Sequence, residues 1–163
     1  MKVLVTGGTG FLGTALVQTL KSSGHEVILT TRKQENPEKG IYNLGDISAD
    51  TNWVNLVQGC DTVIHTAGRA HILNDDAQDA LAEFRRVNHD ATMKLASDAA
   101  TCGVKHFIFV SSIGVNGNAT SGVPFSEASK PRPTSDYAIS KLEAEQSLLK
   151  NFDGSDMAIT IVR

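Results

Sequence analysis

Several features that mark specialised classes of protein are rare or missing in this sequence. Only two of the 163 residues are cysteines, and Cys60 and Cys102 lie far apart at no spacing typical of a metal site. No apolar run approaches the ~20 residues that a membrane-spanning helix needs, and the one at the amino terminus is too short for a signal peptide. The net charge of −3 offers no basic surface for nucleic acid or an anionic membrane. We therefore expect a cytoplasmic protein with reduced thiols, no metal, and no membrane or nucleic-acid partner.

What the sequence does contain is an alternation of two patterns. Short runs rich in β-branched residues predict strands, and apolar residues at helical spacing predict helices. Strands are expected at residues 2–6, 26–31, 41–44, 61–66, 106–110 and 157–162. Helices are expected from residue 11 to a stop at 22–24, and at 51–58, 79–101 and 134–149. Over the length of one domain, this order predicts an α/β, doubly wound parallel sheet spanning residues 1–163.

Three glycines stand between the first expected strand and the first expected helix. Gly7, Gly10 and Gly13 are spaced three apart, and the helix that follows has an apolar face of Phe11, Leu12, Ala15, Leu16 and Leu20. In a Rossmann-type fold such glycines allow a tight turn, the close approach of a pyrophosphate, and close packing of helix on strand. The alternative is a flexible turn without a ligand. The position between strand and helix favours a dinucleotide site, because a helix amino terminus offers free N–H groups and a favourable dipole.

The end of the second strand bears on which dinucleotide is bound. NAD-binding folds place an acidic residue there to hold the ribose 2′-hydroxyl. This sequence has Thr30, Thr31, Arg32 and Lys33 instead. Because no carboxylate would repel a 2′-phosphate and Arg32 could bind one in forked geometry, NADP is favoured and NAD remains possible. In the alternative interpretation, Arg32 and Lys33 only begin a solvated charged loop.

A second set of residues suggests acid–base chemistry. Tyr137 and Lys141 are four residues apart and share one face of an expected helix. The lysine cation, together with the positive ring of an oxidised nicotinamide, would favour the phenolate and lower the pKa of the phenol into working range. Ser111 and Ser112 end the fifth expected strand, where ligands gather in open α/β sheets, and Ser112 could bind the reacting oxygen. Taken singly, each pattern also suits an ordinary helix surface or a strand-ending turn.

Together these motifs resemble the extended short-chain dehydrogenase/reductase family, and specifically its nucleotide-sugar branch of epimerases and 4-ketoreductases. The resemblance covers nearly the whole chain and rests on the glycine triplet, GDI (45–47), DTVIHTAG (61–68), Asn88, FIFVSS (107–112) and YAISK (137–141). The stretches at 68–75, 81–88 and 110–117 resemble a bacterial subgroup with 4-ketoreductases that act on UDP-linked deoxysugars for surface polysaccharides. Two departures are the missing acid after the second strand and Val115-Asn116-Gly117 where Val-Tyr-Gly is frequent.

The resemblance implies roles for individual residues. Ser112, Tyr137 and Lys141 would be catalytic, and Asn88 would anchor the long helix. Asp46 and Ile47 would contact the adenine, while Thr66, Ala67 and Gly68 would line the nicotinamide half. The full set expected to bind the cofactor is Gly7, Gly10, Phe11, Leu12, Gly13, Thr31, Arg32, Asp46, Ile47, Thr66, Ala67, Gly68, Asn88, Tyr137 and Lys141. We expect His65 to be a packed strand residue, and Arg69 and His71 to be weaker candidates for contact with substrate.

The implied reaction is hydride transfer at C4 of a nucleotide sugar, most simply a UDP-sugar, by an NAD(P)-dependent epimerase or reductase with Tyr137 as general acid/base. A non-catalytic dinucleotide sensor on the same fold is the alternative. The family also implies a homodimer formed through the helices at 79–101 and 134–149, with Phe84 and Leu148 as interface candidates. The alternative is that these two residues simply pack on the sheet. Because the sequence stops in or just after a strand, we expect it to lack a carboxyl-terminal substrate lobe and to be inactive alone.

Overall fold

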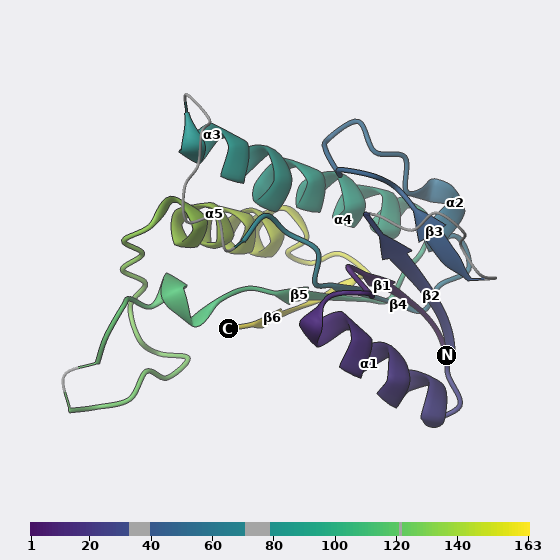
Figure 1. Ribbon diagram of the computed structural model, residues 1–163, viewed down its shortest axis with the longest axis horizontal. Helices are drawn as coiled ribbons and strands as arrows, with labels where there is room; N and C mark the ends of the chain where they lie inside the picture. The colour runs from purple at the N-terminus through teal and green to yellow at the C-terminus, as the bar shows by residue number, and fades with distance from the viewer. Residues whose placement is uncertain (33–39, 71–78, 121) are drawn as a thin grey trace.

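The computed structural model describes residues 1–32, 40–70, 79–120 and 122–163. Six parallel strands form one sheet in the order β3-β2-β1-β4-β5-β6, which confirms the predicted doubly wound α/β fold (Figure 1). The register is set by pairs such as Val3 with Val27 and Val3 with Thr62. The strands are β1 (Lys2–Thr6), β2 (Glu26–Thr31), β3 (Ile41–Asn43), β4 (Thr62–His65), β5 (His106–Val110) and β6 (Ala158–Val162).

Helices cover both faces of the sheet. In Figure 1, α1 (Phe11–Ser22) lies on one side, and α3 (Ala80–Arg85), α4 (Ala91–Thr101) and α5 (Asp136–Asn151) lie on the other. The short α2 (Val54–Val57) also packs on the α4 side, where its Leu56 and Val57 share a core with Leu95. A single 3₁₀ turn, Ile113–Val115, follows β5. All predicted elements are therefore present, with shorter bounds for the third, fourth and sixth strands and for the helix expected at 51–58, and with the helix expected at 134–149 shifted by two residues.

Two hydrophobic cores lie on opposite faces of the sheet because alternate strand residues point in opposite directions. Leu4, Val63 and Phe107 face α4 and α5 in the larger core. Val3, Val5 and Ile64 face α1 in the smaller core, where Val17 is the helix's contribution. The strands are buried on both faces near their middle, as expected for a parallel sheet.

The contact between α1 and β1 depends on one glycine. A Cβ placed on Gly13 would lie 2.1 Å from the carbonyl oxygen of Gly7 and 2.8 Å from Cα of Gly8. Gly13 and Val17 are the buried residues of α1, whereas Phe11 and Leu12 are exposed. The predicted apolar face is therefore wrong for Phe11 and Leu12, and also for the exposed Ala15. Because the helix touches the turn through Gly13, its buried face runs along Gly13 and Val17 and turns the first two residues outward.

The helix expected at 79–101 is interrupted in the middle. A π turn (η1, Arg86–Asp90) separates α3 from α4, so one segment consists of three pieces. Such bulges frequently occur at functional sites because the extra residue redirects a side chain. In this chain the buried residue of the turn is Asn88.

Two residues proposed for a dimer interface do not lie on the surface. Phe84 is 7% exposed and Leu148 is completely buried within the single chain. Phe84 packs against the Tyr137 ring, and Leu148 belongs to the larger core. The choice of these residues for the interface was wrong, since each already has its apolar partners within the protomer.

The described part of the chain has no helix that is both long and apolar enough to span a lipid bilayer.

Replacing Gly13 by alanine should destabilise the fold, although alanine is the better helix former by about 1 kcal/mol. The new methyl would overlap the Gly7 carbonyl, and overpacking of this kind costs about 1–3 kcal/mol. Urea unfolding measures the change, with Gln18→Ala on the exposed side of α1 as the control. A Gly13→Ala variant as stable as the control would contradict the close helix–strand contact.

Candidate functional site

The turn after β1 is shaped for a close approach by backbone or ligand. Gly7 has a φ of 66°, which disfavours any other residue, and the turn leads into the free amino end of α1. A Cβ on Gly7 would lie 3.0 Å from the amide nitrogen of Ala67, so this turn touches the segment that follows β4. The two segments meet between β1 and β4, where the strand order reverses its direction across the sheet. This is the switch point at which open α/β sheets bind ligands.

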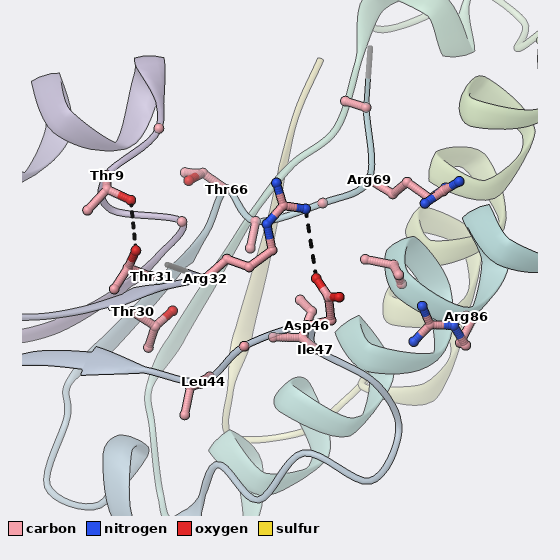
Figure 2. Close-up of a pocket in the computed structure, with 17 residues that line it drawn as sticks. Thr9, Thr30, Thr31, Arg32, Leu44, Asp46, Ile47, Thr66, Arg69 and Arg86 are labelled. Carbon is pink, nitrogen blue, oxygen red and sulfur yellow. Dashed lines mark hydrogen bonds and ion pairs between the residues drawn. The ribbon is translucent and has the colours of Figure 1, made fainter. Parts of the chain in front are cut away.

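A cleft of about 450 Å³ opens above this point. Its walls come from the turn after β1, the end of β2, and the segments after β3 and β4 (Figure 2). Most residues predicted to bind the cofactor line it: Gly7, Gly10, Thr31, Arg32, Asp46, Ile47, Thr66, Ala67 and Gly68. Phe11 and Leu12 lie beside it at the start of α1, and Gly13 lies beneath the turn. The structure thus brings most of the residues predicted to bind the cofactor together around one cleft.

The cleft also has lining residues that the sequence analysis did not select. These are Thr9, Thr30, Leu44, Gly45, Ala70, Arg86 and Val87. Arg69, which was expected only as a candidate for contact with substrate, also lines the cleft. Most directly neighbour a predicted residue, so their position at a strand end was the available signal. Arg86 and Val87 are different, because they come from the π turn of a distant helix. No local pattern places that turn at the cleft.

At the end of β2, the positive charge of Arg32 stands beside a negative charge from another segment, which the local sequence does not show. Thr31 is buried, and its hydroxyl lies 3.1 Å from that of Thr9. Arg32 is exposed, and its Nη1 lies 3.8 Å from Oδ1 of Asp46, an ion pair visible in Figure 2. A carboxylate from the segment after β3 therefore lies beside the end of β2, whose own sequence has none. Lys33 and His71 lie outside the described residues.

The predicted acid–base residues lie at the carboxyl end of β5 and the start of α5. Ser112 accepts a hydrogen bond from the Gly114 amide at 3.1 Å, and Ser135 caps α5 by accepting from the Ala138 amide at 3.2 Å. Burial raises the pKa of Tyr137, while a hydrogen bond with the Ser112 side chain acts in the opposite direction. The Ser112 side chain therefore lies close enough to Tyr137 to affect its pKa. In the chain by itself, burial outweighs this contact and the Tyr137 pKa is raised, so the lowering expected from Lys141 together with an oxidised nicotinamide ring stays a prediction.

Lys141 is buried rather than exposed on the helix surface. Its Nζ lies 3.9 Å from the centroid of the Phe109 ring. Burial lowers the pKa of Lys141 to about 7, and the negative charge of Glu145, one helical turn further on, opposes that change. The ammonium is therefore held in an apolar site with a carboxylate nearby, where its charge depends on pH in the neutral range.

Glu145 is a buried carboxylate that the sequence analysis did not identify. It is 2% exposed, accepts a hydrogen bond from the Ser111 hydroxyl, and pairs with Arg163 at 2.6 Å. Its four-residue spacing from Lys141 was visible in the sequence, but such pairs are common on helix surfaces. Only the packing of α5 against β5 and β6 shows that Glu145 contacts the serine next to Ser112.

Asn88 connects the cleft to α5. Its side chain accepts from the Arg69 amide at 2.8 Å and donates to the Arg69 carbonyl at 3.0 Å and to the Ser140 hydroxyl at 3.1 Å. A Cβ on Gly68 would lie 2.9 Å from Oδ1 of Asn88, so the segment after β4 runs directly against it. Asn88 therefore does more than anchor a helix, because it joins the cleft wall to the helix that carries Tyr137.

Aromatic packing makes the same connection. The Arg69 guanidinium lies 5.5 Å from the centroid of Phe84, and the Phe84 ring meets the Tyr137 ring edge-on at 6.1 Å. Arg69 lines the cleft, so Tyr137 lies one aromatic ring away from its wall. The two predicted groups of residues therefore lie next to each other.

Known proteins match this chain in family, sequence and fold. The family described as NAD dependent epimerase/dehydratase matches residues 3–163. A UDP-glucose 4-epimerase of Vibrio cholerae is 40% identical over 164 residues, which is 99% of this chain and 50% of that protein. The solved structure of MoeE5 with UDP-glucuronic acid and NAD has a TM-score of 0.84 at 31% identity and matches 100% of this chain and 54% of that one.

A third relative extends the comparison to another organism. The UDP-glucose 4-epimerase of Thermus thermophilus, solved in complex with NAD, has a TM-score of 0.81 at 27% identity and matches 100% of this chain and 54% of that one. The chain thus spans about half the length of the relatives it matches.

The Lys141 amine should titrate near pH 7, well below the ordinary lysine pKa of ~10.4. Glu145→Gln should lower this pKa further, because it removes a negative charge that favours the protonated amine. NMR of ¹³Cε-labelled lysine measures both values, with Glu143→Gln on the same helix as the control, since Glu143 pairs with Arg85 instead. An ordinary pKa, or equal shifts in the two variants, would contradict the described environment.

Proposed function

Because the chain belongs to the NAD dependent epimerase/dehydratase family, we propose that it binds a nicotinamide dinucleotide and carries the acid–base residues of an enzyme acting at C4 of a UDP-sugar. The observation that carries the proposal is the connection between the cleft and the Ser112–Tyr137 pair through Asn88 and Arg69. The reaction is hydride transfer, either as a 4-epimerase or as a 4-ketoreductase. The domain would then be the dinucleotide-binding unit of that enzyme.

The residues present fit a dinucleotide. The glycine turn and the amino end of α1 would hold the pyrophosphate, through N–H groups that include those of Phe11 and Leu12. Asp46 and Ile47 would contact the adenine, and Thr31 and Arg32 the adenosine ribose. Thr66, Ala67 and Gly68 would lie along the nicotinamide half, beside Tyr137 and Lys141. Gly7 and Gly68 let the segments that form the cleft pack closely, since a Cβ would lie 3.0 Å from the Ala67 amide nitrogen on the first and 2.9 Å from Oδ1 of Asn88 on the second.

The bound nicotinamide would supply or accept the hydride at the sugar carbon. Tyr137 would move the proton to or from the sugar oxygen, and Ser112 would orient that oxygen by a hydrogen bond. Lys141, with a pKa of about 7, would be able to hold a positive charge beneath the site. The raised pKa of Tyr137 means that the phenol is protonated at neutral pH, which suits the general-acid direction of the reaction.

Epimerase and reductase share these residues and differ in how they treat the cofactor. An epimerase returns the hydride to the same intermediate and keeps its cofactor, whereas a reductase exchanges it after each turnover. Arg32 supports NADP and therefore a reductase, whereas the negative charge of the neighbouring Asp46 would repel a 2′-phosphate and so supports NAD. We propose that the pocket accepts both cofactors with a modest preference for NADP. The charges of Arg32 and Asp46 lie 3.8 Å apart and act in opposite directions on a 2′-phosphate.

A non-catalytic dinucleotide sensor is the second candidate function. It requires the cleft but has no need for Ser112, Tyr137 and a buried Lys141. The contact of Ser112 with Tyr137 favours the enzyme. The homodimer and the cytoplasmic location stay predictions from sequence, and a dimer interface would have to use residues other than Phe84 and Leu148.

Arg32→Ala should weaken NADP⁺ binding several-fold while changing NAD⁺ binding little, because it removes the cation expected at the 2′-phosphate. Asp46→Asn should act in the opposite direction and improve NADP⁺ relative to NAD⁺. Calorimetric titration at one fixed salt concentration measures both, since exposed charges are screened by salt. Lys21→Ala, a cation in the last turn of α1, is the control. Equal effects on both cofactors in each variant would contradict the proposed discrimination.

Tyr137→Phe should lower turnover of a UDP-sugar by about 10²–10⁴-fold while leaving dinucleotide binding largely intact, because only the proton-carrying hydroxyl is lost. The full-length protein is assayed with a panel of UDP-sugars, and Tyr42→Phe, at the partly exposed tyrosine of β3, serves as the matched control. Hydride transfer at the normal rate in Tyr137→Phe would remove Tyr137 from the reaction. Tight dinucleotide binding with no hydride exchange in the unmodified protein would favour the sensor.

A further inference from the structure

We propose that His65 is a positioning residue: fixed as the neutral tautomer with its proton on Nε2, it holds the two turns of the cleft in place relative to α5. The inference rests on the proposed dinucleotide site. His65 is buried and would touch neither the dinucleotide nor the sugar. It would act through its hydrogen-bond partners Thr6 and Thr92.

His65 lies between two buried threonines. It ends β4, is completely buried, and pairs in register with Thr6, the last residue of β1. Its Nδ1 lies 2.6 Å from the Thr6 hydroxyl oxygen, and its Nε2 lies 2.9 Å from that of Thr92 on α4. Each ring nitrogen therefore has one hydroxyl partner, and the tautomer decides which of them donates.

The hydrogen bonds of the Thr6 hydroxyl determine whether Nδ1 of His65 carries a proton. Its oxygen accepts from the amides of Thr66 and Ala67, each at 3.2 Å. Two accepted bonds use both lone pairs of a hydroxyl, and only its proton remains. That proton must point at Nδ1 of His65, so Nδ1 is an acceptor and carries no hydrogen.

The hydrogen bonds of the Thr92 hydroxyl determine independently whether Nε2 of His65 carries a proton. It donates its only proton to the carbonyl of Asn88 at 2.8 Å. Toward Nε2 of His65 it can therefore only accept, so Nε2 carries the hydrogen. The two ends give the same tautomer, and a continuous run of donors leads from the Thr66 and Ala67 amides through Thr6, His65 and Thr92 to Asn88.

The surroundings of the ring favour its neutral form. The Phe109 ring stacks on the imidazole at a centroid distance of 5.9 Å, and the Lys141 ammonium lies 3.9 Å from the same Phe109 ring. A second cation on His65 would stand across one aromatic ring from the first. Burial and then the charge of Lys141 lower the pKa of His65 to about 3, so the ring stays neutral at physiological pH.

The chain of hydrogen bonds through His65 matters because of the segments that it joins at its two ends. At one end, Thr6 binds the amides of Thr66 and Ala67 and precedes Gly7, so it sets the contact between the two turns of the cleft. At the other end, the carbonyl belongs to Asn88, whose side chain holds Arg69 and Ser140. The imidazole is thus the rigid spacer between the cleft floor and the helix turn that connects to α5.

The tautomer can be tested on the chain itself by ¹⁵N NMR of the histidine rings, with the His65 signals assigned from their loss in His65→Phe. We expect Nδ1 without a proton and Nε2 with one, unchanged from about pH 5 to about pH 8, because the pKa of His65 lies below this range. His106, whose Nε2 lies 2.8 Å from the Thr160 hydroxyl at the sheet edge, provides an internal comparison. A proton on Nδ1, or titration of His65 in this range, would overturn the proposal.

The positioning role is tested by NADH affinity, measured by fluorescence titration under conditions in which every variant is folded. His65→Phe and the conservative Thr92→Val should each bind NADH several-fold more weakly, up to roughly tenfold for the loss of a buried hydrogen bond. Leu148→Ala, which removes a buried core side chain on α5, is the control for lost stability and should retain normal affinity.

The outcomes separate the two hypotheses. If the unmodified chain binds NADH but His65→Phe and Thr92→Val bind it equally well, the positioning role is wrong and the proposed function stands. If Leu148→Ala loses as much affinity as they do, affinity merely follows stability and the positioning role is also wrong. If the unmodified chain does not bind NADH, the proposed function fails and the role of His65 fails with it.

Discussion

The contact of α1 with the end of β1 is the constraint on which the site depends. Gly13 lets the helix approach the carbonyl of Gly7 more closely than any side chain would permit. That approach places the amino end of α1 above the switch point between β1 and β4, with Gly7 against Ala67. The cleft therefore forms where backbone meets backbone, and its walls are largely main chain and small residues, which is the surface that a phosphate group needs.

Buried polar groups are concentrated between this cleft and α5. His65, Asn88, Lys141 and Glu145 are each 4% exposed or less. A buried polar group is costly unless it is paired, and each of these has a named partner: hydroxyls for His65, the Arg69 backbone for Asn88, an aromatic ring for Lys141, and Ser111 with Arg163 for Glu145. Such networks hold their members in one arrangement, so this part of the core is more specific in geometry than the apolar layers around it.

Charge at the adenosine end of the cleft comes from two strands. Arg32 follows β2 and Asp46 follows β3, and they face one another across an exposed gap. Exposed ion pairs contribute little to stability, so neither residue is needed for folding. Both are available to a ligand, and the balance between them would decide how well a ribose phosphate is tolerated compared with a ribose hydroxyl.

The sequence by itself determined the order of strands and helices, the glycine turn, and the position of Ser112 at the end of a strand, because these depend on local periodicity and on the meeting of strand ends in a parallel sheet. Tertiary structure decided the rest. The π turn at Asn88, the burial of Glu145 and the pairing of Arg32 with Asp46 all depend on residues distant in sequence, which no local pattern encodes. Phe84 and Leu148 show the same limit: helical spacing identified them as apolar, but only packing showed that their partners lie within the protomer.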